Sequence, residues 1–241
     1  MGVIEILVVR VWSAALLLLG IIFNKLKNNI DAYFALTHFQ QDKLKGLLPE
    51  DKVWIKSNAI NEPINFIPTE NKKNYIFVGR LESEKGIKLL LDTWITLPSH
   101  FHLEIIGLGD SDLLENTYTR ANIKFLGQLP HHEVMQRISS AKYLIHSSLN
   151  YETFGLTMVE ALSVGTPVIG FEIGTRPEFI QSEYNGFLCH ETNLKETILK
   201  SYNYRSYVQL SESAINSVKK YYLPQVTAKQ VNIYEKLKRA Q

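Results

Sequence analysis

The stretch YETFGLTMVEALSVGTP, at positions 151–167, places two carboxylates, Glu152 and Glu160, on either side of an apolar turn. It predicts a helix over about 154–164 that Gly165 caps and that the following proline stops. The first N–H groups of a helix are unpaired and the helix dipole is positive there, so an anion site forms beside Glu152. N–H donors for a diphosphate and carboxylates for hydroxyls suit a polyol phosphate ester such as a nucleotide sugar.

The bulk composition excludes several classes of protein. Of the 241 residues, 45% are hydrophobic and 21% charged, as in a soluble globular protein of one large or two small domains. A net charge of +2 is too small to indicate a nucleic-acid partner, although it permits weak contact with an anionic membrane. The single cysteine, Cys189, excludes an internal disulfide, suits a reducing cytoplasm and is expected to be packed. No Cys/His spacing typical of a structural metal occurs.

The amino-terminal region contains an apolar run at 11–23. It is shorter than the roughly 20 residues that a membrane-spanning helix needs. We expect a helix buried in a larger domain, with membrane association as the second interpretation. A signal peptide is a further alternative because Arg10 precedes the run, but polar and basic residues follow it without a small-residue cleavage site.

Residues 1–60 are expected to form a partial domain that contains this apolar helix. Short buried strands are predicted at 31–37 and 52–56. A helix is predicted over 38–47, with Thr37 as its cap.

Residues 61–74 contain Glu-Pro and Ile-Pro without periodicity, which predicts a linker. Over 75–222, strand-like runs alternate with helices of about ten residues, which predicts right-handed βαβ units and a parallel sheet covered on both faces. A last helix is expected within 223–241, with an apolar stripe that includes Val226 and Ile233. In the large domain we expect strands at 75–78, 101–106, 123–126, 143–146, 167–171 and 187–188, and helices at 86–97, 110–119, 130–141, 193–202 and 211–222.

The loop at 79–86 follows the first strand of the large domain. Ligands of open parallel sheets bind beyond the carboxyl ends of the strands, so this loop is a candidate site. Its two glycines allow close backbone approach, and Arg80 and Lys85 supply two cations suited to a diphosphate. On spacing alone, a surface loop with two solvated charges is an equal alternative.

Three later loops also follow strands. Gly107-Leu108-Gly109 has the start of a dinucleotide fingerprint but lacks the third glycine, so a plain glycine turn is favoured for it alone. The backbone of Gly127-Gln128-Leu129 is placed to meet a base edge. The segment 174–178 is another turn that opens a helix.

Together and in order, these motifs resemble the donor half of a family 4 glycosyltransferase. Such enzymes are retaining and have the GT-B fold, in which two Rossmann-like domains face each other across a cleft. The resemblance runs from about Asp31 to the C-terminus. It depends on Gly79-Arg80-Leu81…Lys85-Gly86, Gly107-x-Gly109, Phe125-Leu126-Gly127, Ser148…Glu152-Thr153-Phe154-Gly155-Leu156…Glu160-Ala161, Gly165-Thr166-Pro167-Val168, Gly174…Glu178 and Asn185-Gly186.

The resemblance implies roles for the charged residues. Arg80 and Lys85 hold the donor diphosphate, Glu152 hydrogen-bonds the transferred sugar, and Glu160 binds the ribose hydroxyls. A preset Arg/Lys pair and a helix N-terminus then stabilise the leaving group without a metal. The alternative for Glu160 is a solvated helix residue, which its apolar neighbours disfavour. The expected donor contacts are Gly79, Gly107, Gly109, Gly127, Gln128, Leu129, Ser148, Thr153, Phe154, Gly155, Leu156 and Glu160.

The same resemblance predicts an α/β chain that departs from the family in one respect. A full acceptor domain should precede the donor domain, but residues 1–60 correspond only to its end, and His38 is no obvious substitute for the histidine usually placed near the reacting sugar. We therefore expect a donor module that needs a missing N-terminal domain or partner chain. Its acceptor is expected to be a saccharide or a lipid-linked molecule, and its location cytoplasmic or peripheral at the inner membrane face. One alternative is a complete transferase whose acceptor is a membrane lipid held by the apolar N-terminus. The others are a non-catalytic nucleotide-sugar binding module and, more distantly, a GT-B epimerase.

Overall fold

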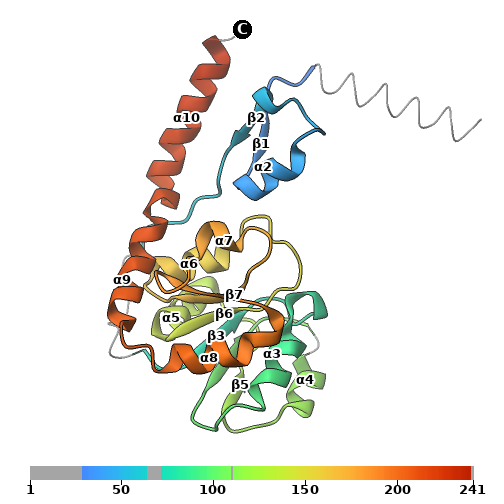
Figure 1. Cartoon of the computed structure of the whole chain (residues 1–241), viewed down its shortest axis with the longest axis vertical. Coiled ribbons are helices and arrows are strands. Elements are labelled where there is room, and N and C mark those ends of the chain that lie inside the picture. The colour runs from blue at the N-terminus through green and yellow to red at the C-terminus, as the bar shows by residue number, and fades with distance from the viewer. Residues whose placement is uncertain (1–28, 64–71, 110, 240–241) are drawn as a thin grey trace, which may run out of the picture.

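The computed structural model describes residues 29–63, 72–109 and 111–239. They form a six-stranded parallel sheet with helices on both faces, and a smaller unit of two parallel strands and one helix (Figure 1). The predicted α/β class is confirmed. The predicted apolar helix at 11–23 and residues 64–71 of the predicted linker lie outside the described residues.

The large sheet has the strand order β5-β4-β3-β6-β7-β8, and every pair of neighbours is parallel. Successive side chains of one strand face opposite sides of a sheet, and both sides are apolar here. Tyr75 and Phe77 pack into the core on one face, while Ile76 between them packs into the core on the other. The strands are β3 (Tyr75–Val78), β4 (Leu103–Ile106), β5 (Ile123–Phe125), β6 (Tyr143–His146), β7 (Val168–Phe171) and β8 (Gly186–Cys189).

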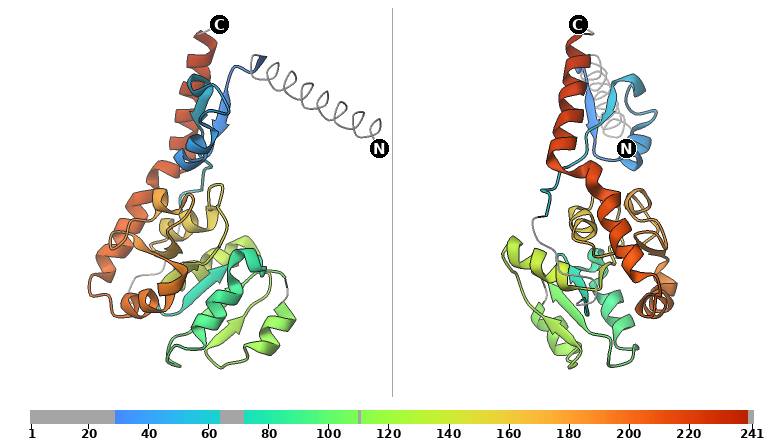
Figure 2. Two further views of the ribbon diagram at one scale, coloured as in Figure 1. Left: turned by 45° about the vertical axis from the view of Figure 1, so that its right-hand side comes forward. Right: turned by 90° about the vertical axis from the view of Figure 1, so that its left-hand side faces the viewer.

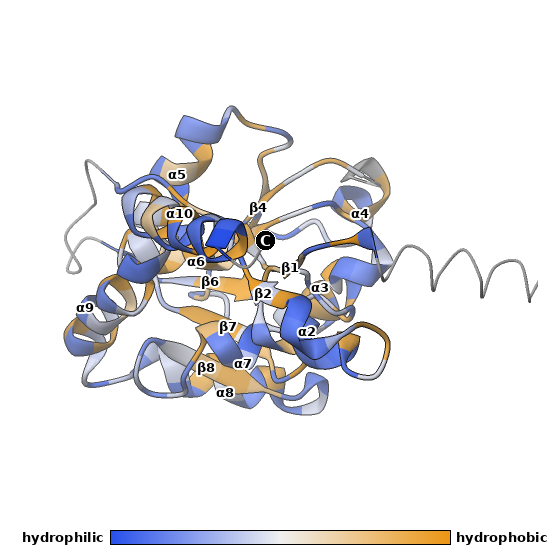
Figure 3. Cartoon of the chain, turned by 90° about the horizontal axis from the view of Figure 1, so that it is seen from above, coloured by the Kyte–Doolittle hydropathy of each residue, from blue (hydrophilic) through white to orange (hydrophobic). Residues whose placement is uncertain are grey.

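Helices bury one apolar stripe each against these two cores. Figure 3 shows the hydrophobic strands between helices whose outer surfaces are hydrophilic. One core includes residues of α3 (Ile87–Trp94), α4 (Ser111–Thr117) and α8 (Leu194–Tyr202), and the other includes residues of α5 (His131–Ser140), α6 (Leu156–Ser163), α7 (Arg176–Phe179) and α9 (Tyr207–Val218). Cys189 is buried in the first core as a free thiol, as expected.

The small unit contains β1 (Tyr33–Ala35), α2 (His38–Leu44) and β2 (Val53–Ile55), with Tyr33 opposite Val53. Thr37 caps α2 as predicted, since its hydroxyl accepts a hydrogen bond from the N–H of Gln40 at 3.2 Å. The last helix, α10 (Leu223–Arg239), runs from the large unit to the side of β1 and β2 (Figures 1 and 2). No helix in the described part of the chain is long and apolar enough to cross a membrane.

Several predicted helix boundaries are wrong by a few residues. The central helix starts at Leu156 rather than Phe154, because Gly155 has a left-handed backbone (φ 83°) and acts as its N-cap. The predicted helix at 211–222 is instead α9 (Tyr207–Val218) followed by a separate 3-10 turn at Lys219–Tyr221. The helix predicted over 38–47 ends at Leu44. Periodicity locates the middle of a helix, whereas the turn that ends it depends on local backbone geometry.

The carboxyl end of α6 is held by a buried lysine. The ammonium of Lys72 donates to the carbonyl oxygens of Val164 and Gly165, at 2.9 and 2.7 Å, and to the hydroxyl of Thr166 at 2.9 Å. The last carbonyls of a helix are otherwise unpaired, and a cation there offsets the negative end of the dipole. Lys72 therefore fixes α6 from the end opposite the candidate site.

Candidate active site

The order of the strands identifies where a ligand should bind. From β3 the chain proceeds through β4 to β5 on one side, and then returns to β6 on the other side. Ligands of open α/β sheets bind at the carboxyl ends of the strands where the order reverses, which is between β3 and β6 here. A cavity of about 230 Å³ lies there, lined by residues that follow β3, including Gly79 and Lys85, and by residues 145–148 and 152–157 around and after the end of β6.

The two loops of this cavity are in direct contact. Gly86 has φ 67°, and a Cβ on it would lie 1.9 Å from the carbonyl oxygen of Ser147, so only glycine fits. The hydroxyl of Ser147 donates to the carbonyl of Lys85 at 3.0 Å, and the N–H of Leu149 donates to that of Glu84 at 2.9 Å. These contacts set the distance between Lys85 and the acidic residue on the other loop.

Lys85 and Glu152 form an ion pair inside the cavity. The ammonium of Lys85 lies 2.8 Å from Oε1 of Glu152, and the two side chains are 25% and 18% exposed. Burial opposes ionisation of Glu152 and is the largest influence on its pKa. Lys85, together with His146 and Ser148, outweighs burial and keeps the pKa of Glu152 below its usual value. The cavity thus presents a cation and an ionised hydrogen-bond acceptor side by side.

His146, the last residue of β6, also faces this pair. Its Nε2 lies 3.8 Å from Oε1 of Glu152, and its buried Nδ1 has no hydrogen-bond partner. Burial and the neighbouring Arg176 lower the pKa of His146 to about 4, against the opposing effect of Glu152. The imidazole is therefore neutral near pH 7. Sequence reasoning gave His146 no role, although its position at the carboxyl end of a strand was a usable signal.

The low pKa of His146 should make the protein sensitive to acid. The unfolded chain binds a proton at this group below pH 6.5, whereas the folded chain does so only near pH 4. Stability should thus fall as the pH falls from 6.5 to 4, by up to about 3 kcal/mol from this group at about 1.4 kcal/mol per pKa unit. Urea unfolding of His146→Asn should show a smaller loss over this window. A His132→Asn control, at an exposed position, should keep the full loss; equal losses in both variants would contradict the assignment.

Arg176 is a second residue whose role sequence reasoning missed. It is fully buried, and its guanidinium donates to the carbonyls of Phe171 and Ser148, both at 2.8 Å, and to that of Asn150 at 3.4 Å. Burial lowers its pKa to about 10, which leaves it charged. Arg176 therefore holds the loop that leads to Glu152. The sequence located Arg176 in a turn but contained no signal that its side chain points inward.

The start of α6 forms another wall of the cavity. Thr153, Phe154, Gly155 and Leu156 line it, and no side chain caps the helix. The ring of Phe154 is buried against Phe179, so it contributes its backbone rather than its side chain. Backbone N–H groups at a helix start favour an anion. Ser148 also lines the cavity, and its predicted contact with the donor stays a prediction.

Arg80 does not join this cluster. Its guanidinium forms ion pairs with Glu82 and Glu84 on its own loop, and its side chain is 59% exposed. Of the two predicted cations, only Lys85 lines the cavity. The role predicted for Arg80 stays a prediction, which requires the side chain to leave these carboxylates.

Gly107 and Gly109 lie outside the cavity and are explained by packing. A Cβ on Gly107 would lie 1.8 Å from the carbonyl oxygen of Gly79, and one on Gly109 would lie 2.7 Å from that of Leu81. These glycines let the loop after β4 support the loop after β3. Their predicted contact with the donor stays a prediction.

Glu160 lies in a second, larger cavity of about 860 Å³ between α5, α6 and residues 59–63. Its Oε1 is 2.9 Å from Nε2 of His131, and the side chain is 22% exposed. Leu156 lines both cavities, so the two glutamates lie on either side of one residue. The segment Gly127-Gln128-Leu129 leads into α5 just before His131, and the carbonyl of Gly127 accepts from the N–H of Gly107 at 2.9 Å. Within the described ranges, no three His, Cys, Asp or Glu residues are grouped to hold a metal.

Comparison with known families bears directly on this geometry. The sequence profile of the family described as "Glycosyl transferases group 1" matches residues 61–216. The chain belongs to this family. The match covers the whole large sheet and most of the residues that line both candidate cavities, so the predicted family resemblance is confirmed.

Individual glycosyltransferases agree with this assignment. An uncharacterised glycosyltransferase of Methanocaldococcus jannaschii is 27% identical over 215 residues, which is 78% of this chain and 55% of that protein. A glycosyltransferase of Rickettsia africae has a TM-score of 0.78 at 20% identity, over 91% of this chain and 68% of that one. Anabaena HepE in complex with UDP-glucose has a TM-score of 0.74 at 16% identity, over 86% and 64%. The chain thus spans little more than half the length of the Methanocaldococcus jannaschii protein.

Proposed function

We propose that the chain is the donor-binding part of a retaining glycosyltransferase that uses a UDP- or GDP-sugar. The observation that carries this proposal is the cavity between β3 and β6, where the Lys85–Glu152 pair lies beside the uncapped start of α6. Family membership supports nucleotide-sugar-dependent transfer. The solved relative that contains UDP-glucose has the same fold.

Each part of the cavity has a role in the proposed reaction. The bond between the sugar C1 and the diphosphate oxygen breaks, an acceptor oxygen bonds to C1 with retention, and the acceptor hydroxyl loses its proton. Negative charge that builds on the diphosphate is stabilised by Lys85 and by the N–H groups of α6, without a metal in this proposal. Glu152 accepts hydrogen bonds from the transferred sugar. Glu160 binds the ribose, and the backbone at 127–129 flanks the base.

The acceptor in this proposal is a saccharide or a lipid-linked saccharide on the cytoplasmic side of a membrane. In the described residues the acceptor-side unit comprises β1, α2 and β2, and its Phe34 ring lies 6.0 Å from that of Tyr234 on α10. In this proposal a further domain or a partner chain completes the cleft, and the isolated chain binds the donor more readily than it transfers the sugar. The same small unit favours a second candidate function, a nucleotide-sugar binding module without catalysis.

Calorimetric titration with UDP, GDP and their sugars tests the proposal. Glu160→Gln should weaken nucleotide and nucleotide sugar alike, by about 1–3 kcal/mol for a lost charged hydrogen bond. Glu152→Gln should weaken the nucleotide sugar more than the bare nucleotide. Glu133→Gln, at a half-exposed position on α5, is the matched control and should bind normally. Absence of binding at millimolar concentration would overturn the site, and equal effects of the first two variants would contradict their separate roles. Sugar transfer by the isolated chain would exclude the non-catalytic function.

A further inference from the structure

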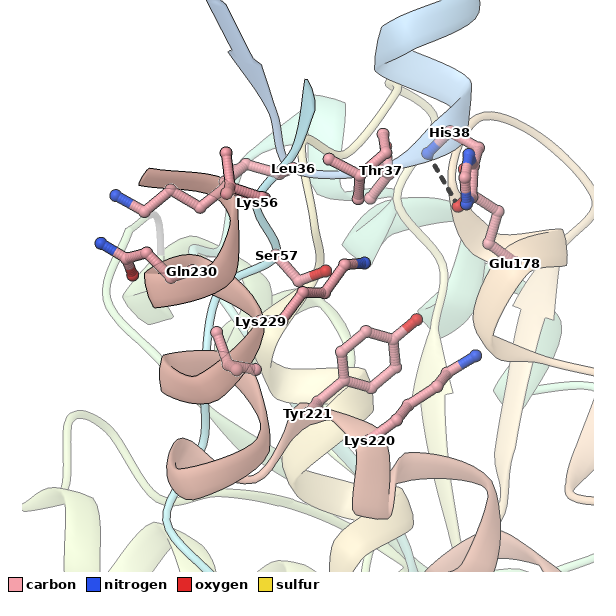
Figure 4. Close-up of a pocket in the computed structure, with 13 residues that line it drawn as sticks. Leu36, Thr37, His38, Lys56, Ser57, Glu178, Lys220, Tyr221, Lys229 and Gln230 are labelled. Atoms are coloured by element: carbon pink, nitrogen blue, oxygen red, sulfur yellow. Dashed lines mark hydrogen bonds between the residues drawn. The ribbon is translucent and has the colours of Figure 1, made fainter. Parts of the chain in front are cut away.

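A third cavity, of about 280 Å³, lies between the small unit and the large one. Its walls are the start of α2, the end of β2, the start of α7, the turn at Lys219–Tyr221 and one side of α10 (Figure 4). Ser57 lines this cavity and its neighbour Asn58 lines the one at Lys85, so the chain that joins the two units separates the two cavities. None of the roles assigned to the donor uses it.

Positive charge exceeds negative charge in this cavity. Lys56, Lys220 and Lys229 line it together with a single carboxylate, that of Glu178. In the described part of the chain, neither Lys220 nor Lys229 forms an ion pair with a carboxylate. The ammonium of Lys56 lies over the ring of Phe34, 5.4 Å from its centroid, and that of Lys220 lies over the ring of Tyr221, 5.1 Å from its centroid. Lys220 and Lys229 are the cations that lie beside the hydroxyls of this cavity (Figure 4).

Glu178 offsets only part of this positive charge, and both of its oxygens accept hydrogen bonds from α2. Its Oε2 accepts from the N–H of His38 at 3.0 Å, and its Oε1 accepts from the N–H of Phe39. The carboxylate thus caps α2 at the edge of the cavity, and three lysines against one carboxylate leave the cavity positively charged. It also ties the small unit to the large one at the edge of this space.

Hydroxyl groups complete a donor set around the same space. Figure 4 shows the ammonium groups of Lys220 and Lys229 and the hydroxyls of Ser57 and Tyr221 around a common opening. Burial, reinforced by Glu178, raises the pKa of Tyr221 to about 12, so its hydroxyl remains a donor at neutral pH. Two ammonium groups and two hydroxyls offer more donors than a carboxylate needs and suit the several oxygens of a phosphate.

We propose that this cavity between the two units binds the phosphate group of a small phosphorylated compound or of a phospholipid. A phosphate carries about two negative charges and three acceptor oxygens, which matches two ammonium groups with adjacent hydroxyls. The compound is either free in solution or part of a membrane surface. Binding of the phosphate stabilises the contact between the two units. Lys220 and Lys229 lie in the turn at Lys219–Tyr221 and in α10, whereas Ser57 lies in the segment that follows β2 of the small unit.

The test compares two double variants that remove the same charge. Lys220→Ala/Lys229→Ala removes the two lysines that are proposed to bind the phosphate. Lys219→Ala/Lys236→Ala instead removes exposed lysines of the same turn and the same helix, which do not line the cavity. Inorganic phosphate is titrated into each ¹⁵N-labelled protein, and the amide shifts of residues 57 and 219–230 are followed. The native protein and the control should bind alike, and the first variant should bind tenfold or more weakly, at about 1.4 kcal/mol per tenfold.

A second measurement identifies the source of the phosphate. Each protein is sedimented with phosphatidylcholine vesicles that contain phosphatidic acid. Vesicle binding that requires Lys220 and Lys229 assigns a phospholipid, whereas phosphate binding without vesicle binding assigns a soluble compound. No shift with phosphate and no vesicle binding, or equal losses in both double variants, would overturn the proposal.

Saturation with UDP separates this proposal from that of the donor site. Phosphate shifts should persist when UDP is bound, and Lys220→Ala/Lys229→Ala should bind UDP as the native protein does. Displacement of phosphate by UDP would place the phosphate in the donor cavity and overturn the proposal. Failure of UDP to bind, with intact phosphate shifts at 219–230, would instead contradict only the donor site.

Discussion

Replacement of Lys85 by methionine is expected to weaken binding of a nucleoside diphosphate by about 2–4 kcal/mol, since charged hydrogen bonds are worth more than neutral ones. Lys85 is the cation that lines the cavity between β3 and β6, and it lies 2.8 Å from Glu152. Its removal deletes the diphosphate partner and also leaves the half-buried Glu152 without its ammonium. The loss should therefore be larger for a nucleotide sugar than for the nucleotide, and calorimetry measures both.

Lys88→Met provides the matched control for this result. Lys88 lies one turn further along, is 70% exposed and pairs with Asp92 at 2.6 Å. An exposed ion pair contributes roughly 0–1 kcal/mol, so this variant should bind the nucleotide normally. Normal binding by Lys85→Met as well would remove Lys85 from the site and shift the diphosphate role to Arg80.

Replacement of Arg176 by methionine is expected to lower the free energy of unfolding by about 3–5 kcal/mol. Methionine fills a similar length but donates no hydrogen bond, so the carbonyls of Phe171, Ser148 and Asn150 lose their buried donor. Relief from burying an unpaired guanidinium offsets part of this cost. Urea unfolding measures the change, and the released loop should also weaken nucleotide-sugar binding through Glu152.

Arg120→Met is the matched control, because it replaces an exposed arginine by the same residue. Among the described residues, Arg120 donates one hydrogen bond, to the carbonyl of Ile95 at 2.8 Å. Its loss should cost about 1 kcal/mol or less. If Arg176→Met were as stable as Arg120→Met, the carbonyls around Arg176 would have found other donors, and its role in holding the loop would be refuted.

The fold was predictable because its signal is repeated along the chain. Each strand of the large sheet is a short apolar run, and each is followed by a glycine-containing loop or a helix, so the parallel α/β arrangement does not depend on any one motif. Lys85 was a candidate because ligands bind at the carboxyl ends of strands, and Glu152 because it lies beside the start of the central helix. The structure brings their side chains to 2.8 Å.

Other parts of the site depend on side-chain contacts that could not be predicted from the local sequence. Arg80 and Lys85 are equivalent in the sequence, but Glu82 and Glu84 on the same loop pair with Arg80 and draw it away from the cavity. Gly107 and Gly109 were assigned to the donor because glycines permit close approach. The close approach that the structure shows is to the neighbouring loop. The inward direction of Arg176 depends on carbonyls contributed by two separate loops.

The contact between Gly86 and Ser147 has a consequence for engineering donor specificity. At this contact the two loops are so close that a methyl group on Gly86 would not fit. Replacing only one of the two loops would therefore alter the distance between them. Grafts from other family members should therefore transfer residues 79–86 and 147–155 as one cassette. A library that varies both segments together is expected to yield new sugar-binding sites. In a library that varies only one segment, most variants are expected to clash with the unchanged loop.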